Sequence, residues 1–206
     1  MEAALRRLHE TDSLSLVAIR EISLSQLENL IRPAGYFRQK ATRLKLFVNF
    51  VDTCYGGSLT RMFAQPTGKL RDELLTLNGV GPETADSILL YAGQHEVFVV
   101  DAYARRILER HSLAEPAADY EEIRTMFEGA LSSLLGADGP KSSPGVGQFP
   151  AHEPSPVSRL ARSPLAQIYN DMHGLIVAVG KHYCLKSNPN CEACPLGSFL
   201  SAYPRG

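Results

Sequence analysis

The 206-residue sequence lacks the long apolar stretch that a membrane-spanning helix requires. No segment reaches the roughly 18 consecutive apolar residues of a spanning helix. The first residues, Met1–Arg6, predict the start of an amphipathic helix and not a secretory signal, because no apolar core segment follows the charges. The sequence therefore argues against an integral membrane protein and against a secreted one.

Cysteine is scarce and the charges nearly cancel. Four unevenly spaced cysteines fit a reducing compartment and metal ligation better than a disulfide scaffold. The 21 basic and 22 acidic residues leave a net charge of −1. Such a balance is not typical of a nonspecific nucleic-acid binder. Any binding to nucleic acid must therefore come from local clusters of charge.

Alternating apolar and polar residues, the mark of half-buried strands, are also missing, and helical spacing dominates instead. Ser23 and Gln26 have the spacing of a capping box at a helix start, and Pro33 and Gly35 end that helix. With 44% hydrophobic residues the chain can build a core. The sequence predicts an all-α protein of one large or two small domains.

The most informative segment is a pair of predicted helices joined by a glycine turn. Residues 78–81, Asn-Gly-Val-Gly, tolerate positive φ and allow another backbone to approach closely. Pro82 suits the first position of a helix that is predicted to end at Gly93. The N–H groups of such a turn can bind an anion such as a phosphodiester oxygen. The alternative is an ordinary helical hairpin whose glycines serve only close packing.

A short apolar run, residues 97–100, leads directly to Asp101 and to a predicted helix that starts at Ala102. This arrangement holds a carboxylate at the edge of the core. Asp101 is predicted to cap the helix, a role that contributes about 1 kcal/mol. The same carboxylate is also available for catalysis, and the two roles are compatible.

Together these residues carry a resemblance to a known family. The pattern Leu-x-Gly-Val-Gly-x-x-Thr-Ala, followed by an apolar run that ends in Val-Asp, resembles the HhH-GPD superfamily of helix-hairpin-helix DNA glycosylases related to endonuclease III. The resemblance implies an all-α fold of two helical domains. It places a helical-barrel domain with the hairpin motif (about 70–92) at 1–96, and a second domain with the catalytic aspartate and the C-terminal cysteines at 97–206.

The resemblance also implies roles for individual residues. Asp101 takes the position of the catalytic aspartate, and Gly79, Val80, Gly81 and Thr84 take positions that bind the DNA backbone. The implied partner is double-stranded DNA that contains damaged bases. The implied enzyme is a monomer of the cytoplasm, associated with the nucleoid if the source is bacterial.

One position distinguishes reaction types. Bifunctional members carry a lysine two residues after the glycine turn, where this sequence has Glu83. A carboxylate cannot form the imine of covalent amine catalysis. The segment most resembles the 3-methyladenine glycosylase branch, which implies hydrolytic removal of flipped, alkylated bases to leave an abasic site. The alternatives are an endonuclease III-like glycosylase and AP lyase on oxidised pyrimidines, and a noncatalytic hairpin module that binds DNA.

Near the C-terminus, Cys184, Cys191 and Cys194 follow the spacing C-x6-C-x2-C. Family members that hold a [4Fe-4S] cluster continue with x5-C, a position that is Leu200 here. The resemblance thus leaves several possibilities: a labile or three-cysteine cluster, a cluster with another fourth ligand, or a metal-free remnant. Zinc bound by these thiolates with a histidine (His173 or His182) is a further alternative. Cys54, in an apolar helix, is interpreted as a buried thiol.

Two sets of basic residues are candidates for contacts with phosphate. One lies around a single predicted helix, where Lys40 is the selected DNA-binding residue among Arg38, Arg43 and Lys45. The other follows the aspartate, where Arg105 precedes Arg106. A solvated helix face is the alternative for the first set.

Two further expectations concern the chain's extent. Residues 136–164 are rich in proline, glycine and serine, which predicts a flexible insertion between two helices. In relatives, a helix with a Gln-Asn-Thr-type sequence precedes the segment that corresponds to Met1–Leu8. The resemblance therefore implies an N-terminus that is truncated relative to the family: either the start of the protein was assigned too late, or the protein lacks part of the family's pocket.

Overall fold

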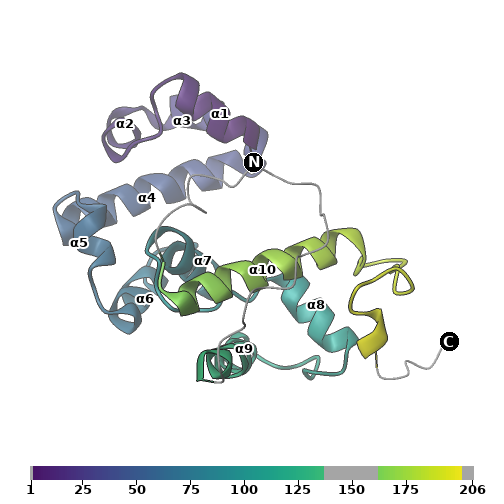
Figure 1. The fold of residues 1–206 in the computed structure, drawn as a ribbon. Coiled ribbons are helices and arrows are strands. Elements are labelled where there is room, and N and C mark those ends of the chain that lie inside the picture. Colours follow the sequence, from purple (N-terminus) through teal and green to yellow (C-terminus); the bar gives the residue numbers. More distant parts are fainter. Residues whose placement is uncertain (1, 137–161, 201–206) are drawn as a thin grey trace. The chain divides into compact units, whose positions relative to one another are not determined.

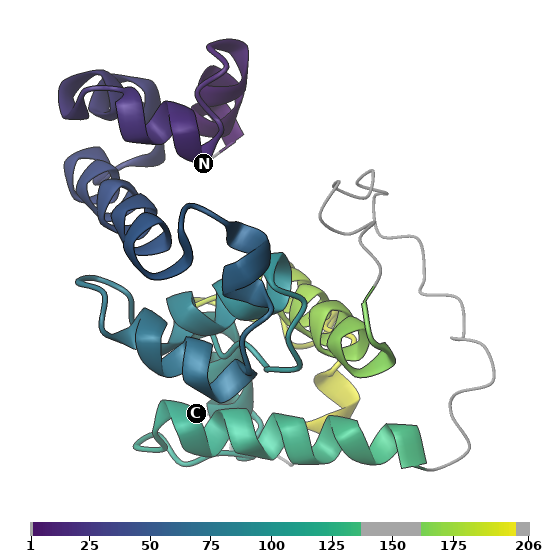
Figure 2. The same cartoon turned by 90° about the vertical axis from the view of Figure 1, so that its left-hand side faces the viewer.

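The computed structural model describes residues 2–136 and 162–200 (Figures 1 and 2). Every regular element in these ranges is helical, as the sequence predicts. The predicted flexible insertion lies outside the described residues, apart from its ends: Gly136 closes one helix, and Pro164 opens the next after Arg162 and Ser163. None of the described helices combines the length and the apolar character that crossing a bilayer demands.

The chain divides into two compact units, Met1–Gly81 and Pro82–Gly206. This division falls inside the helical hairpin. The domain boundary implied by the family resemblance, between residues 96 and 97, stays a prediction. The described elements of the first unit are α1 (Glu2–Glu10), α2 (Leu16–Glu21), α3 (Leu24–Ile31), η1 (Arg32–Ala34), α4 (Phe37–Tyr55), α5 (Leu59–Phe63) and α6 (Thr67–Leu75).

Within the first unit, the long helix α4 packs against α2 and α3, and α1 packs against α3. Leu27 of α3 and Ala41 of α4 are fully buried in the core that these helices share. The predicted capping box is confirmed: the Ser23 side chain accepts the N–H of Gln26, and the Gln26 side chain accepts the N–H of Ser23. This reciprocal pair satisfies two backbone donors that a helix start leaves open.

The interpretation of Cys54 as a buried thiol is wrong, because its side chain is exposed. The buried stripe of α4 runs through Val48, Val51 and Tyr55. Cys54 precedes Tyr55 by one position, which turns it about 100° around the helix. An apolar helix was the right prediction, but the exposed face of that helix was not identified.

The second unit begins with the other half of the hairpin. Its described elements are α7 (Pro82–Ser87), η2 (Ile88–Ala92), α8 (Ala102–Arg110), α9 (Tyr120–Gly136), α10 (Pro164–His182) and η4 (Gly197–Phe199). Pro82 opens α7, and Gly93 ends the same helical run, both as predicted. The sequence did not predict that the second half of this run, η2, is a π-helix.

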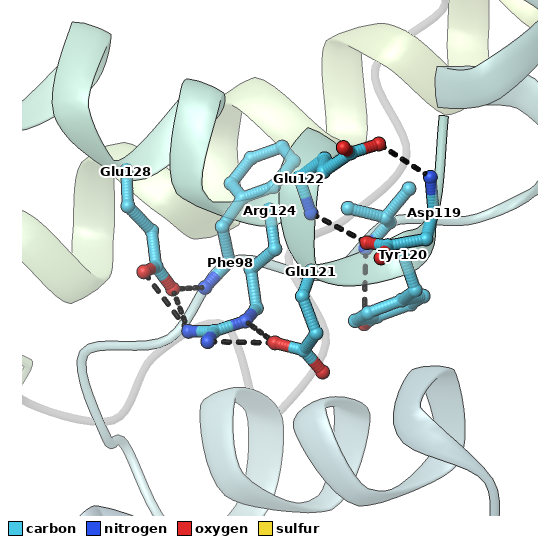
Figure 3. A network of polar contacts seen from close by, with 8 residues as sticks. Phe98, Asp119, Tyr120, Glu121, Glu122, Arg124 and Glu128 are labelled. Atoms are coloured by element: carbon cyan, nitrogen blue, oxygen red, sulfur yellow. Dashed lines mark hydrogen bonds and ion pairs between the residues drawn. The ribbon is translucent and has the colours of Figure 1, made fainter. Parts of the chain in front are cut away.

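The apolar run 97–100 is buried and leads into α8 without forming a strand. Side chains of α9 accept hydrogen bonds from the backbone N–H groups of this run (Figure 3). The N–H of Phe98 donates to Glu128 Oε1 at 2.9 Å, and the N–H of Val100 donates to the Tyr120 hydroxyl at 3.3 Å. Arg124 holds Glu128 through an ion pair of 2.9 Å. These bonds fix the segment that positions Asp101.

Glu128→Ala is expected to lower the free energy of unfolding by about 1–3 kcal/mol, because it leaves the buried N–H of Phe98 without an acceptor. Chemical denaturation measures this change. Glu115→Ala is the matched control, since this glutamate is exposed. Equal stability of the two variants would contradict the role given to Glu128.

Contacts between α8 and α10 set the alignment of these two helices. Gly180 of α10 lies against the Tyr103 ring, where an added Cβ would come within 2.3 Å of Tyr103 Cδ1. Arg106 of α8 donates to the carbonyls of Gly180 (3.2 Å) and Cys184 (2.7 Å). His173 precedes Gly180 by seven residues, two turns of helix, and therefore lies on the same face of α10. The α8–α10 contact thus directs His173 toward the start of α8.

Candidate active site

Asp101 stands at the N-terminus of α8 in an extended backbone conformation. Its Oδ1 atom accepts the N–H of Ala104 at 2.8 Å, which confirms the predicted cap. Its other oxygen, Oδ2, lies 3.5 Å from His173 Nε2 of α10. Only 13% of each side chain is exposed. The carboxylate is therefore held on one side by backbone and faces an imidazole on the other.

His173 has a second partner on the opposite side of its ring. The Tyr91 hydroxyl, from η2, lies 2.5 Å from His173 Nδ1. The edge of the Phe98 ring packs near the imidazole, with ring centroids 6.5 Å apart. Tyr91, His173 and Asp101 thus form a continuous polar row inside the second unit.

The pKa values of Asp101 and Glu83 are shifted in opposite directions. Burial works to raise the pKa of the Asp101 carboxyl, but His173 and the N–H groups of Ala104 and Tyr103 outweigh it, and the pKa lies below its ordinary value. Burial, followed by the negative charge of Asp101, raises the pKa of Glu83. Asp101 therefore stays ionised over a wider range of pH than Glu83.

Burial and then the charge of Asp101 also raise the pKa of the Tyr91 hydroxyl, against the opposing charge of Arg162. Tyr91 is thus a protonated phenol at neutral pH. A permanent carboxylate in a mostly buried position can stabilise a positive charge that develops on a sugar.

The sequence did not predict that His173 and Tyr91 belong to the site. His173 entered the sequence analysis only as an alternative zinc ligand, whereas the structure pairs it with Asp101. It is 72 positions from Asp101 along the chain, and no local motif marks it. Only the packing of α10 on α8 and on η2 reveals the pairing.

The glycine turn of the first unit has the conformation that the sequence predicts. Gly79 has a φ of +82°, in the left-handed region that favours glycine. The Val80 N–H donates to the Leu77 carbonyl at 3.0 Å and closes the turn. The Arg43 side chain of α4 covers Gly79, where a Cβ would come within 2.1 Å of Arg43 Nε. Gly81, in contrast, has open space around its Cβ position.

The residues selected for DNA binding are placed as follows. Thr84 is exposed on α7. The Lys40 ammonium donates to the Ala34 carbonyl at 2.5 Å, and the Arg105 guanidinium donates to the Ala118 carbonyl at 2.5 Å. Both cations therefore stabilise nearby backbone in this structure, and their contacts with DNA stay predictions. Of the other basic residues near Lys40, Lys45 donates to the carbonyls of Arg20 and Ile22.

The three C-terminal cysteines follow α10. The Cys184 thiol is buried beside Arg110, with 3.0 Å between the sulfur and Nη1. Cys191 and Cys194 are partly buried in the following loop. Within residues 2–136 and 162–200, no three acidic, histidine or cysteine side chains converge as a metal site, and Leu200 holds the fourth position of the family's spacing. The donor set is one thiolate short of the four that normally hold a cluster.

Residues 1–132 match the family model of the HhH-GPD superfamily of base excision DNA repair proteins. A protein of Methanocaldococcus jannaschii, named as a candidate DNA repair glycosylase, is 37% identical over 202 residues. The match covers 97% of this chain and 76% of that protein.

Solved structures with similar folds point the same way. The H. pylori 3-methyladenine DNA glycosylase bound to 1,N6-ethenoadenine superposes with a TM-score of 0.70 at 29% identity, over 87% of this chain and 75% of that one. A noncovalent complex of endonuclease III with DNA superposes with a TM-score of 0.65 at 21% identity, over 96% and 73% of the two chains. These similarities confirm the predicted all-α, endonuclease III-like fold.

Proposed function

The chain belongs to the HhH-GPD superfamily of base excision DNA repair proteins and is a DNA glycosylase, and we propose that it removes alkylated bases from DNA by hydrolysis, without cutting the strand. The observation that carries this proposal is the Asp101 carboxylate. It is largely buried, anchored at a helix N-terminus and kept ionised by its surroundings. Cleavage of a glycosidic bond leaves positive charge on the sugar, and a fixed carboxylate stabilises that charge.

Glu83 supports the monofunctional reaction. It occupies the position where bifunctional relatives carry the lysine nucleophile, and its pKa is raised by burial and by the charge of Asp101. A carboxyl group at this position offers no amine to attack the sugar. Water is then the nucleophile, and the product is an abasic site in an intact strand.

Alkylated purines, 3-methyladenine above all, are the substrates that we propose. Methylation at a ring nitrogen gives the base a positive charge, which weakens the glycosidic bond before the enzyme acts. Asp101 is then sufficient without a strong general acid. The target base has to leave the helix stack to reach a buried carboxylate. The similarity to a 3-methyladenine glycosylase structure at 29% identity supports this choice of substrate.

The proposed partner is duplex DNA that carries a damaged base, bound by a single copy of the chain. The turn at Gly79–Gly81, Val80 included, is proposed to contact the sugar-phosphate backbone, with Thr84, Lys40 and Arg105 as further contacts. Its donors are the N–H groups of Gly79 and Gly81, because the Val80 N–H already donates to the Leu77 carbonyl. The enzyme acts where chromosomal DNA lies, in the cytoplasm and on the nucleoid in a bacterial cell.

An iron–sulfur cluster stays a prediction, which rests on Cys184, Cys191 and Cys194. Three thiolates need a fourth ligand that the family spacing does not supply here, because Leu200 stands at that position. The visible absorption spectrum of freshly purified protein tests for the cluster. No step of the proposed reaction involves it.

A panel of duplexes, each with one lesion, tests the proposed function. The panel includes 3-methyladenine, 1,N6-ethenoadenine, an oxidised pyrimidine and an undamaged control. We expect release of the methylated purine with an intact strand. Preferred release of oxidised pyrimidines with strand cleavage would favour the endonuclease III-like alternative, and binding without any release would favour a noncatalytic module.

A further inference from the structure

We propose that His173 and Tyr91 form a positioning relay for Asp101. In this relay, Tyr91 fixes the proton of the imidazole on Nε2, and the Nε2–H group holds Oδ2 of the Asp101 carboxylate. This inference rests on the proposed function, because it explains how Asp101 is prepared for catalysis. Tyr91 lies within residues 1–132, which match the family model, whereas His173 lies outside them. Both are positioning residues, since they act through Asp101.

The Tyr91 hydroxyl and the His173 imidazole share a short hydrogen bond, with 2.5 Å between the phenol oxygen and Nδ1. A phenol can donate to a ring nitrogen or accept from a ring N–H, so the direction of this bond follows from the other ring nitrogen, Nε2. When Nε2 carries the proton of a neutral ring, Nδ1 accepts from the hydroxyl, and the two contacts support each other.

The other ring nitrogen of His173, Nε2, faces Asp101. Nε2 is buried, makes no hydrogen bond within the described residues, and lies 3.5 Å from Asp101 Oδ2. A bare nitrogen lone pair in this position would face a carboxylate oxygen and repel it. An Nε2–H group removes this repulsion in both the neutral and the doubly protonated ring.

The contact between His173 Nε2 and Asp101 Oδ2 is long. A separation of 3.5 Å is at the outer limit of a hydrogen bond. Hydrogen bonds of catalytic groups are often long without substrate and shorten in the reacting complex. The opposite oxygen of Asp101 is already fixed by Ala104 at 2.8 Å. Oδ1 is thus fixed before DNA binds, whereas the contact of Nε2 with Oδ2 is expected to shorten in the reacting complex.

Other elements packed against α10 also present charged groups. The carboxyls of Asp101 and Glu83 interact electrostatically with His173. The charge of Arg162 opposes the rise in the pKa of Tyr91. From α9, Arg124 and Glu128 act on Tyr169, about one turn before His173. These groups are kept unchanged in the variants described next.

A pair of substitutions at His173 tests the relay. In His173→Gln the side-chain amide reaches the place of Nε2 and can donate to Asp101, whereas in His173→Asn the shorter amide reaches only the place of Nδ1. In single-turnover release of 3-methyladenine from a duplex, we expect the asparagine variant to be about 10- to 100-fold slower than wild type, the range typical of losing a supporting partner. The glutamine variant is expected to keep most of the rate. Equal rates for the two variants would overturn the proposal.

Tyr91→Phe provides a second test that does not depend on the variants of His173. Without the hydroxyl, the ring is free to place its proton on Nδ1, and Nε2 then offers no N–H to Asp101. By carbon-13 NMR, the pKa of the Asp101 carboxyl in this variant is therefore expected to lie above that of wild type. A pKa equal to that of wild type would contradict the relay.

A measurement without substrate separates this proposal from the proposed function. Titration of the Asp101 carboxyl by carbon-13 NMR is expected to show a higher pKa in His173→Asn than in wild type, because burial is then less opposed. The pKa in His173→Gln is expected to stay near that of wild type. If wild type released no base from any lesion while this difference in pKa was found, the proposed function would fail and the relay would stand. An unchanged pKa in His173→Asn would reject the relay whatever the activity.

Discussion

Asp101→Asn is expected to slow the release of alkylated bases by about 100- to 10,000-fold. The substitution removes the negative charge that opposes the developing charge on the sugar. It keeps a side-chain oxygen that can accept the N–H of Ala104, so the cap of α8 is retained. Single-turnover kinetics on a duplex with one 3-methyladenine measure the chemical step directly.

The matched control is Asp119→Asn. Asp119 also caps a helix, since its Oδ1 atom accepts the N–H of Glu122 at 2.8 Å. This variant makes the same chemical change at another helix start and is expected to keep the wild-type rate. DNA binding by both variants is expected to stay within a few-fold of wild type. A rate for Asp101→Asn within about threefold of wild type would exclude Asp101 as the catalytic group.

Two glycine substitutions in the turn are expected to weaken binding to duplex DNA by about tenfold or more, for different reasons. Gly79→Ala places a Cβ on a residue with a φ of +82° and displaces the Arg43 side chain that covers it. We expect this variant also to lose about 1 kcal/mol of stability. Gly81→Ala adds a methyl group into open space and is expected to melt like wild type.

Gly81→Ala is therefore the clean test of the turn as a backbone contact. Its added methyl group meets no protein atom within 4 Å and can interfere only with a bound molecule. Fluorescence anisotropy with undamaged duplex measures the affinity, and thermal denaturation measures stability. Gly68→Ala, on α6 and also in open space, is the control for a neutral added methyl group. Wild-type affinity in Gly81→Ala would show that the turn does not approach the DNA.

Local features were predictable from sequence because short-range rules fix them. The capping box at Ser23, the start of α7 at Pro82 and the cap at Asp101 each depend on residues within four positions. The left-handed conformation of Gly79 follows from the lack of a Cβ. These features, together with helical spacing, were sufficient to predict the fold class.

The rest of the site depends on tertiary packing. His173 meets Asp101 because Gly180, seven residues later, lets α10 approach Tyr103 of α8 closely. A glycine within a helix carries no signal that identifies its partner. The exposure of Cys54 has the same origin, since helical spacing predicts a buried stripe but does not fix its width.

The central claim is tested most directly by product analysis after wild-type enzyme acts on a duplex with a single 3-methyladenine. The free base is measured in solution, and the strand is examined before and after alkali and after borohydride. The account predicts free 3-methyladenine, a strand that breaks only on alkali treatment, and no covalent adduct with borohydride. A protein–DNA adduct trapped by borohydride would contradict it. So would the absence of free 3-methyladenine with wild-type enzyme, which would then be no more active than Asp101→Asn.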